Sequence, residues 1–114
     1  MEALYDQSGS VYAWLQMNGH ICGLDGENLA FIDGDSVYEW DGKHIGWWQD
    51  GHIRDASGAV ALFRADATNM GVFMPMRQVP PLHPLRPLSP HRPVKTSKPL
   101  RPKYLAEWSD EMPF

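Results

Sequence analysis

Four eleven-residue stretches decide the fold of this chain: residues 4–14 read LYDQSGSVYAW, 21–31 ICGLDGENLAF, 37–47 VYEWDGKHIGW and 53–63 IRDASGAVALF. Their central glycines, Gly9, Gly26, Gly42 and Gly58, stand 17, 16 and 16 residues apart. An aliphatic residue lies five positions before each glycine, and an aromatic residue lies five positions after it. A period this short and regular indicates a repeat architecture built from one small structural unit.

Each copy has the periodicity of a β-hairpin. In the first copy Tyr12 and Trp14 would face one way, and Ala13 and Leu15 the other, which is the alternation of a strand. Asp-Gly and Asn-Gly pairs, which favour tight hairpin turns, recur along the same region. The sequence therefore predicts an all-β antiparallel meander of eight strands at about residues 2–7, 10–17, 20–24, 27–32, 35–40, 43–49, 52–56 and 59–64.

Four equivalent hairpins are expected to close around a pseudo-four-fold axis, because closure removes the exposed edges of the sheet. Closure would bring the repeat aromatics into one ring around the axis: Trp14, Phe31, Trp47 and Phe63. Two interpretations of this ring are open. It is either the packed core of a shallow barrel, or the lining of an axial pocket that binds a small apolar ligand or lipid.

The pattern Tyr5-Asp6-x-x-Gly9-x-Val11-x-Ala13-Trp14-Leu15, with the Asp-Gly hairpins and the proline-leucine tail, resembles the 4-fold β-flower proteins, an uncharacterised and largely bacterial family. The resemblance implies a shallow, symmetric barrel of hairpins. By analogy of fold alone it points to lipid or apolar ligands, and it implies no catalytic residues. Arg54 and Leu62 depart from the other copies, so the fourth hairpin is expected to be irregular.

Charge and composition divide the chain near residue 70. Residues 1–70 carry a net charge of −8 and residues 71–106 a net charge of +7, and all ten prolines lie at or after Pro75. We therefore expect a four-repeat β-flower domain, a linker or extra strand, a proline-rich basic tail and an acidic anchor segment, over residues 1–66, 67–79, 80–103 and 104–114. The repeat domain is marginal in size, so we expect the tail or oligomerisation to help stabilise it.

Several classes of protein are disfavoured by the sequence. Cys22 is the only cysteine, which excludes an intrachain disulfide and favours a reducing compartment. No signal peptide is evident, and no stretch approaches the roughly 18 apolar residues of a membrane span. We expect a cytoplasmic protein with no transmembrane segment.

Prolines recur at every third position from Pro81 to Pro102, and Thr96 is the one break in the series. A polyproline II helix has three residues per turn, so each column of the sequence forms one edge of a rod. One edge is mostly apolar and another is mostly basic. A straight rod over residues 80–103 would reach roughly 75 Å, too long to lie wholly on a domain of this size.

The tail is either a solvated spacer or a recognition rod whose basic edge meets an acidic surface of its own or a neighbouring subunit. The candidate partner-binding residues are Leu82, Leu85, Arg86, Leu88, Arg92, Lys95, Lys98 and Arg101. We expect self-association or a protein partner. We expect no nucleic-acid partner, because the whole chain is acidic and no aromatic residues interleave the basic edge.

The last segment is compatible with two structures. Its apolar residues, Tyr104, Leu105, Trp108 and Met112, fit one face of a short helix that docks into a groove, and an unstructured acidic end is the alternative.

Candidate catalytic chemistry is sparse. His20, His44 and His52 lack the paired spacing of a metal site, and exposure beside a turn is the favoured interpretation. Cys22 has no activating partner in the sequence. We expect no catalytic residues, no metal and no cofactor, and we interpret the chain as a non-enzymatic interaction module. The alternative is a binder of a small apolar ligand or lipid at the aromatic ring.

Overall fold

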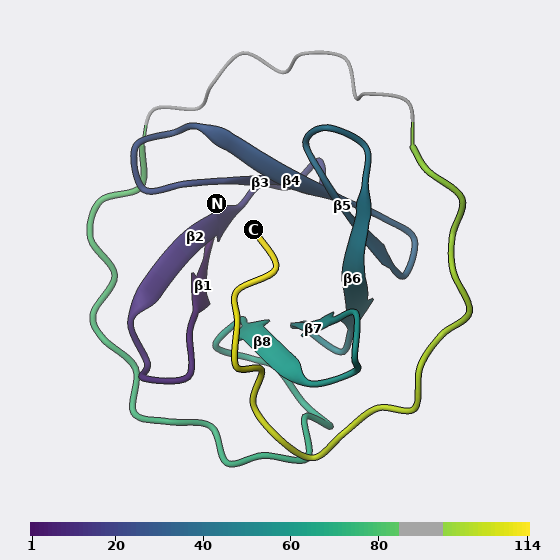
Figure 1. Cartoon of the computed structure of the whole chain (residues 1–114). Helices are drawn as coiled ribbons and strands as arrows, with labels where there is room; N and C mark the ends of the chain where they lie inside the picture. Colours follow the sequence, from purple (N-terminus) through teal and green to yellow (C-terminus); the bar gives the residue numbers. More distant parts are fainter. Residues whose placement is uncertain (85–94) are drawn as a thin grey trace.

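The computed structural model describes residues 1–84 and 95–114, and its repeat region forms a closed antiparallel barrel, seen along its axis in Figure 1. Each strand pairs with the next in sequence, and β1 closes the barrel against β8 at Tyr5 and Phe63. The predicted all-β fold is confirmed. The described residues contain no helix, and so none that could cross a membrane. The strands are β1 (Glu2–Tyr5), β2 (Val11–Leu15), β3 (His20–Cys22), β4 (Asn28–Asp33), β5 (Ser36–Glu39), β6 (His44–Gln49), β7 (His52–Asp55) and β8 (Val60–Phe63).

The repeat glycines turn the four hairpins in the same way. Gly9 has a φ of 84°, a left-handed value that costs glycine little. In the same turn Asp6 Oδ1 accepts hydrogen bonds from the backbone N–H groups of Ser8 (3.0 Å) and Ser10 (3.1 Å). A β-bulge lies beside this turn in all four hairpins. Because bulges increase local twist and bend, this repeated irregularity helps short strands close into a barrel.

Aliphatic residues fill the inside of the barrel. The residues five positions before each repeat glycine are fully buried in one cluster: Leu4, Ile21, Val37 and Ile53. Each pairs across its hairpin with the residue four positions after the glycine, which is Ala13, Ala30, Gly46 or Leu62. Three of these four partners are small, and so the interior has room for the aliphatic ring and for little else.

The repeat aromatics do not surround the axis. They lie on the outer face of the barrel, alternating with the interior residues, and are at most 5% exposed: Trp14, Phe31, Trp47 and Phe63. Their predicted burial is confirmed, but the expectation of an aromatic-lined axial ring is wrong. The physical reason is space, because a small eight-stranded barrel holds only modest side chains inside. Residues after the last strand contact Trp14, Trp47 and Phe63 on this outer face, and Phe31 packs against Tyr38 and Trp40.

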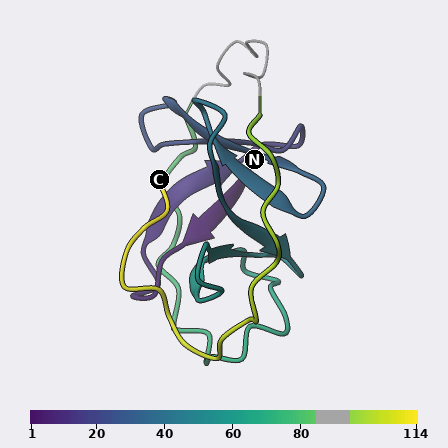
Figure 2. The same cartoon turned by 45° about the vertical axis from the view of Figure 1, so that its right-hand side comes forward.

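The described parts of the tail lie against the barrel rather than leaving it (Figure 1). They run along the outside of the hairpins, as Figures 1 and 2 show. Gln78, Thr96 and Leu105 each donate a backbone hydrogen bond to a repeat glycine carbonyl, those of Gly9 (2.8 Å), Gly42 (2.9 Å) and Gly58 (3.0 Å) in turn. The donors are 18 and 9 residues apart, whole multiples of the three-residue period of the tail. The described parts of the tail therefore do not extend away from the barrel as a straight rod (Figure 1).

The last residues close one end of the barrel. Trp108 forms a bridge to Val60, and Ser109 donates a backbone hydrogen bond to Val60 O at 2.7 Å. Phe114 packs against the interior cluster, and its carbonyl accepts a 2.6 Å hydrogen bond from Tyr12 Oη. The helical interpretation of residues 104–114 is wrong, because β8 offers these residues backbone hydrogen bonds in an extended conformation.

Candidate functional site

The basic edge of the tail contacts the barrel of its own chain. Lys95 forms an ion pair with Asp33, and Lys98 and Arg101 both form ion pairs with Asp35. Hydrogen bonds from Lys98 and, less strongly, Arg101 hold the pKa of Asp35 below its ordinary value. Three predicted partner-binding residues are therefore already paired within the chain.

The same cations cover an aromatic residue of the outer face. Lys98 Nζ and Arg101 Cζ each lie 5.5 Å from the centre of the Trp47 ring. Such a position over an aromatic face is attractive, because the ring carries negative charge density on its faces. Earlier in the tail, the rings of His83 and Trp14 form a T-shaped pair with their centres 5.8 Å apart. Trp14 and Trp47 thus form part of the surface on which the described parts of the tail lie.

Thr96, the break in the proline series, is explained by two hydrogen bonds. Its N–H donates to Gly42 O, and its Oγ1 accepts from the N–H of His44 at 3.0 Å. Gln78 occupies the corresponding place on the first hairpin, where its Oε1 accepts from the N–H of Val11 at 3.3 Å. Proline could supply neither the N–H donor nor the side-chain acceptor. The interruption is where the tail is attached to the third hairpin.

Arg54 links the segment that follows β8 to the segment that follows the tail. Its Nη1 donates to the carbonyls of Gly58 and Leu105, both at 2.7 Å, and its Nη2 donates to Met70 O at 2.9 Å. The side chain is only 3% exposed, and the Tyr104 ring centre lies 4.5 Å from its guanidinium carbon. Burial lowers the pKa of Arg54 below its ordinary value. The irregular fourth repeat thus provides the residue that joins the segments before and after the tail to the barrel.

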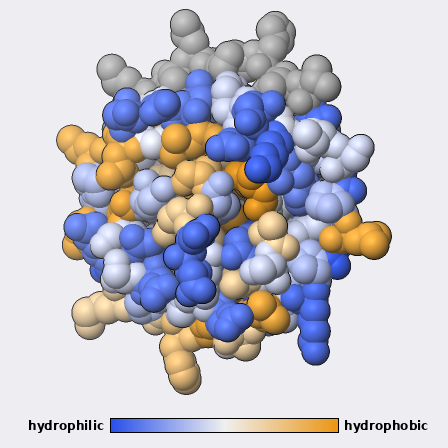
Figure 3. Space-filling view, in the orientation of Figure 1, coloured by the Kyte–Doolittle hydropathy of each residue, from blue (hydrophilic) through white to orange (hydrophobic). Residues whose placement is uncertain are grey.

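The opposite edge of the tail faces solvent. Four large apolar residues stand three positions apart there and are 87–98% exposed: Phe73, Met76, Val79 and Leu82. Leu100, in the same column of the sequence, is 96% exposed. Figure 3 shows apolar side chains projecting from the perimeter of the molecule. We call these five residues the outward apolar edge.

The structure describes four of the eight predicted partner-binding residues of the tail. Leu82 lies on the outward apolar edge, while Lys95, Lys98 and Arg101 face the barrel. Leu85, Arg86, Leu88 and Arg92 lie outside the described residues. The sequence reasoning missed Phe73, Met76 and Val79, although the three-residue period, extended backwards from Leu82, reaches all three.

The end of the barrel away from Phe114 carries a hollow of about 590 Å³. Four residues in its lining stand six positions after a repeat glycine, one from each copy: Leu15, Ile32, Trp48 and Arg64. Glu2 and Met17 also line it. We call this hollow the barrel mouth. The sequence does not predict the barrel mouth, because the expected axial ring consists of the repeat aromatics and not of the residues that follow them.

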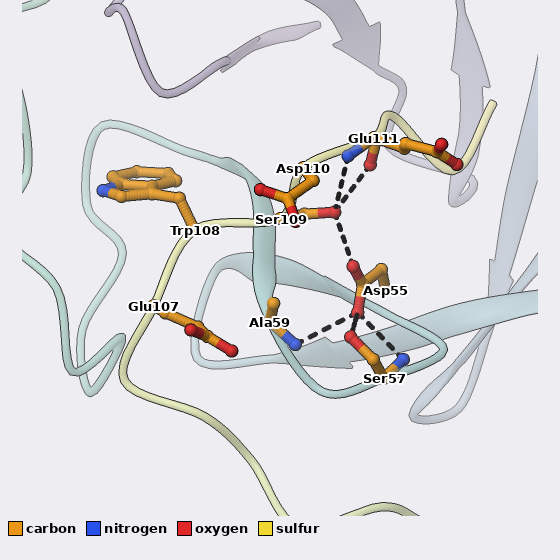
Figure 4. Close-up of a pocket in the computed structure, with 8 residues that line it drawn as sticks. All are labelled: Asp55, Ser57, Ala59, Glu107, Trp108, Ser109, Asp110 and Glu111. Atoms are coloured by element: carbon orange, nitrogen blue, oxygen red, sulfur yellow. Dashed lines mark hydrogen bonds between the residues drawn. The ribbon is translucent and has the colours of Figure 1, made fainter.

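A second hollow lies where the last segment crosses the fourth hairpin (Figure 4). Asp55 and Ser109 are joined there by a hydrogen bond, and Asp55 Oδ1 also accepts from the N–H groups of Ser57 (2.9 Å) and Ala59 (3.1 Å). Glu107, Asp110 and Glu111 complete an acidic lining. In the part of the chain that the structure describes, no three His, Cys, Asp or Glu side chains gather so as to hold a metal ion.

The histidines are not exposed beside turns as expected. His20 is 5% exposed and His52 is fully buried, while His44 packs against the rings of Tyr38 and Trp47. Burial, and secondarily the charge of Arg54, lowers the pKa of His52. Burial also raises the pKa of the Cys22 thiol, so this cysteine has none of the thiolate character of a nucleophile.

Comparison with known proteins bears on the family and not on the site. No curated protein and no solved structure matches the chain. The family model described as 4-fold beta flower protein matches residues 2–113, which includes the barrel, the tail and nearly all of the last segment. The repeat glycines, the closed barrel of four hairpins and this match agree, and the chain belongs to the 4-fold beta flower protein family.

Proposed function

We propose that this protein is a non-enzymatic interaction module, and that its outward apolar edge contacts a partner protein. The observation that carries the proposal is the near-complete exposure of five large apolar residues at multiples of three positions. Four of the five, Phe73 to Leu82, follow one another at three-residue spacing along one described segment, so a partner that lies along this segment can contact them in turn. We place this activity in the cytoplasm, which a single buried cysteine supports.

The way the tail is attached favours this function. Backbone hydrogen bonds, ion pairs and Arg54 fix its inner side to the barrel, so the outer side is held in an extended shape before any partner binds. Binding then orders little additional chain, which reduces the entropy lost on association. Extended proline-rich segments with apolar residues at regular spacing are recognised by aromatic grooves in other proteins. A protein with such a groove is the partner we propose.

The test replaces Phe73, Val79 and Leu82 with serine. Cross-linking in the native cells identifies a candidate partner, and the affinity is then measured between the two purified proteins. We expect the triple variant to bind at least about tenfold more weakly, since buried interface anchors carry most of the binding energy. Its thermal midpoint should be unchanged because these side chains are exposed.

A matched control replaces Met17 and Leu24 with serine. These two residues are 97% and 53% exposed and lie on turns of the barrel. Its affinity for the partner should equal that of the native protein. Equal affinity of the triple variant and the native chain would overturn the proposal. Sedimentation of the same proteins tests whether the partner is a second copy of the chain, in which case the triple variant alone should become monomeric.

A further inference from the structure

The barrel mouth has a composition that folding does not require. Leu15, Ile32 and Trp48 pack on the interior cluster and offer apolar surface to the hollow. The fourth copy places Arg64 in the equivalent position. A fourth apolar residue would cover the interior equally well, so the fourth copy adds a positive charge that the other three copies lack.

Arg64 is held in one place by three neighbours. Its guanidinium carbon lies 5.3 Å from the centre of the Trp48 ring, Nη1 lies 3.2 Å from Glu2 Oε2, and Nε lies 3.0 Å from Asp66 Oδ1. The side chain is 29% exposed. Within residues 1–84 and 95–114, the ion pairs of Arg64 are made through Nη1 and Nε, and Nη2 donates no hydrogen bond to a protein acceptor. Arginine holds its N–H donors in a rigid planar arrangement that suits a carboxylate. The Nη2 group of Arg64, fixed beside apolar surface, can therefore donate to the carboxylate of a ligand.

We propose that the barrel mouth binds a small amphipathic carboxylate, with its apolar body on Leu15, Ile32 and Trp48 and its carboxylate on Arg64. A hollow of about 590 Å³ lies within the size range of pockets for small molecules. An apolar lining with one fixed polar group is also the usual design of such pockets, in which the polar group sets the orientation of the ligand.

Glu2 competes for the same guanidinium. Its side chain is 59% exposed, and exposed ion pairs contribute little to stability, so an incoming carboxylate can displace it at low cost. Removing the charge of Glu2 should strengthen carboxylate binding, whereas removing the charge of Arg64 should weaken it.

The experiment measures the binding of decanoate and decanol to the full chain by calorimetry, below the concentration at which decanoate forms micelles. The native protein should bind decanoate more tightly than decanol. R64Q should lower the affinity for decanoate about tenfold or more and leave that for decanol nearly unchanged, while E2Q should raise the affinity for decanoate. K43Q is the matched control, since Lys43 lies at the opposite end of the barrel, and its affinities should equal those of the native chain.

Ile32→Glu tests the apolar part of the site, because it places a repelling carboxylate on the lining. It should abolish decanoate binding while circular dichroism shows a folded barrel. If that variant unfolds, Ile32→Ala, with a severalfold weaker affinity for both probes, takes its place. No binding of either probe to the native chain, or an affinity for decanoate that R64Q does not lower, would overturn the proposal.

Discussion

The barrel and the tail use opposite kinds of contact. In the barrel each strand pairs with the next along the chain, so its ladders join segments that are close in sequence, apart from the closure of β1 on β8. In the tail the partners are far apart in sequence: Thr96 is bonded to Gly42, and Leu105 to Gly58. The tail contacts groups that the hairpins leave free, above all the carbonyls of the repeat glycines. Because the hairpin is repeated, its free backbone carbonyl is repeated too. A second segment with a three-residue period can therefore form the same hydrogen bond on more than one hairpin.

The largest expected effect comes from removing a residue on which both regions depend. Trp47 is 1% exposed, between the barrel and the cations of the tail. Trp47→Ala should lower the free energy of unfolding by about 3–5 kcal/mol, the usual range for a buried aromatic. Chemical denaturation measures it, with Leu24→Ala as an exposed control. An unchanged midpoint would mean that the tail does not bury this residue in solution.

Arg54→Met should separate the tail from the barrel. The variant keeps much of the volume but leaves the carbonyls of Gly58, Met70 and Leu105 without their charged donor. We expect a loss of about 3 kcal/mol, since hydrogen bonds to a buried charged group are among the stronger ones. Limited proteolysis should cut residues 65–84 faster than in the native chain while the hairpins stay protected. Cleavage at the native rate would show that Arg54 does not hold the tail.

Two glycine substitutions compare the covered and the free turns. Gly9 and Gly34 both have positive φ, and an alanine at either position costs about 1–2 kcal/mol in conformation alone. A Cβ at Gly9 would also overlap the carbonyl oxygen of Met76 in the tail, whereas one at Gly34 meets nothing within 4 Å. Gly9→Ala should therefore be more destabilising than Gly34→Ala in thermal denaturation. Equal losses would place the tail elsewhere.

Thr96→Pro distinguishes a spacer from an attached segment. It completes the proline series, and a spacer would tolerate it or gain stability from a stiffer chain. Here it removes a backbone donor to Gly42 and the acceptor of the His44 N–H, so we expect a loss of about 1–2 kcal/mol. Thr96→Val retains the backbone donor and should lose about half as much in the same denaturation assay.

A pH effect should arise from the buried histidine of β7. Burial lowers the pKa of His52 in the folded state, so the unfolded chain binds more protons once the pH falls below about 6.5. The contribution of neutral His52 is present above that pH and is lost as the pH falls. Its slope cannot exceed about 1.4 kcal/mol per pH unit for one proton. His52→Gln should flatten unfolding curves measured between pH 7.5 and 5.5, and an unchanged slope would contradict this assignment.

The barrel could be predicted from local sequence signals. The spacing of the repeat glycines, the turn residues and the alternation between Ala13 and Trp14 are local signals, and hairpins are local structures, so the strands and their order followed directly. Burial of the repeat aromatics could be predicted too, because a large ring at a strand position in a small domain needs cover. Membership of the 4-fold beta flower family agrees with that pattern.

Which face of each strand is inside, and where the described parts of the tail lie, depend on contacts between residues far apart in the sequence. Alternation divides each strand into two faces but does not say which one is interior, and the limited space between eight strands settled that for the aliphatic ring. The roles of Arg54, Thr96 and Arg64 were likewise hidden, because each depends on groups that closure of the barrel brings together. The period of the tail was visible in the sequence. Which of its edges faces solvent depends on where the glycine carbonyls stand in space.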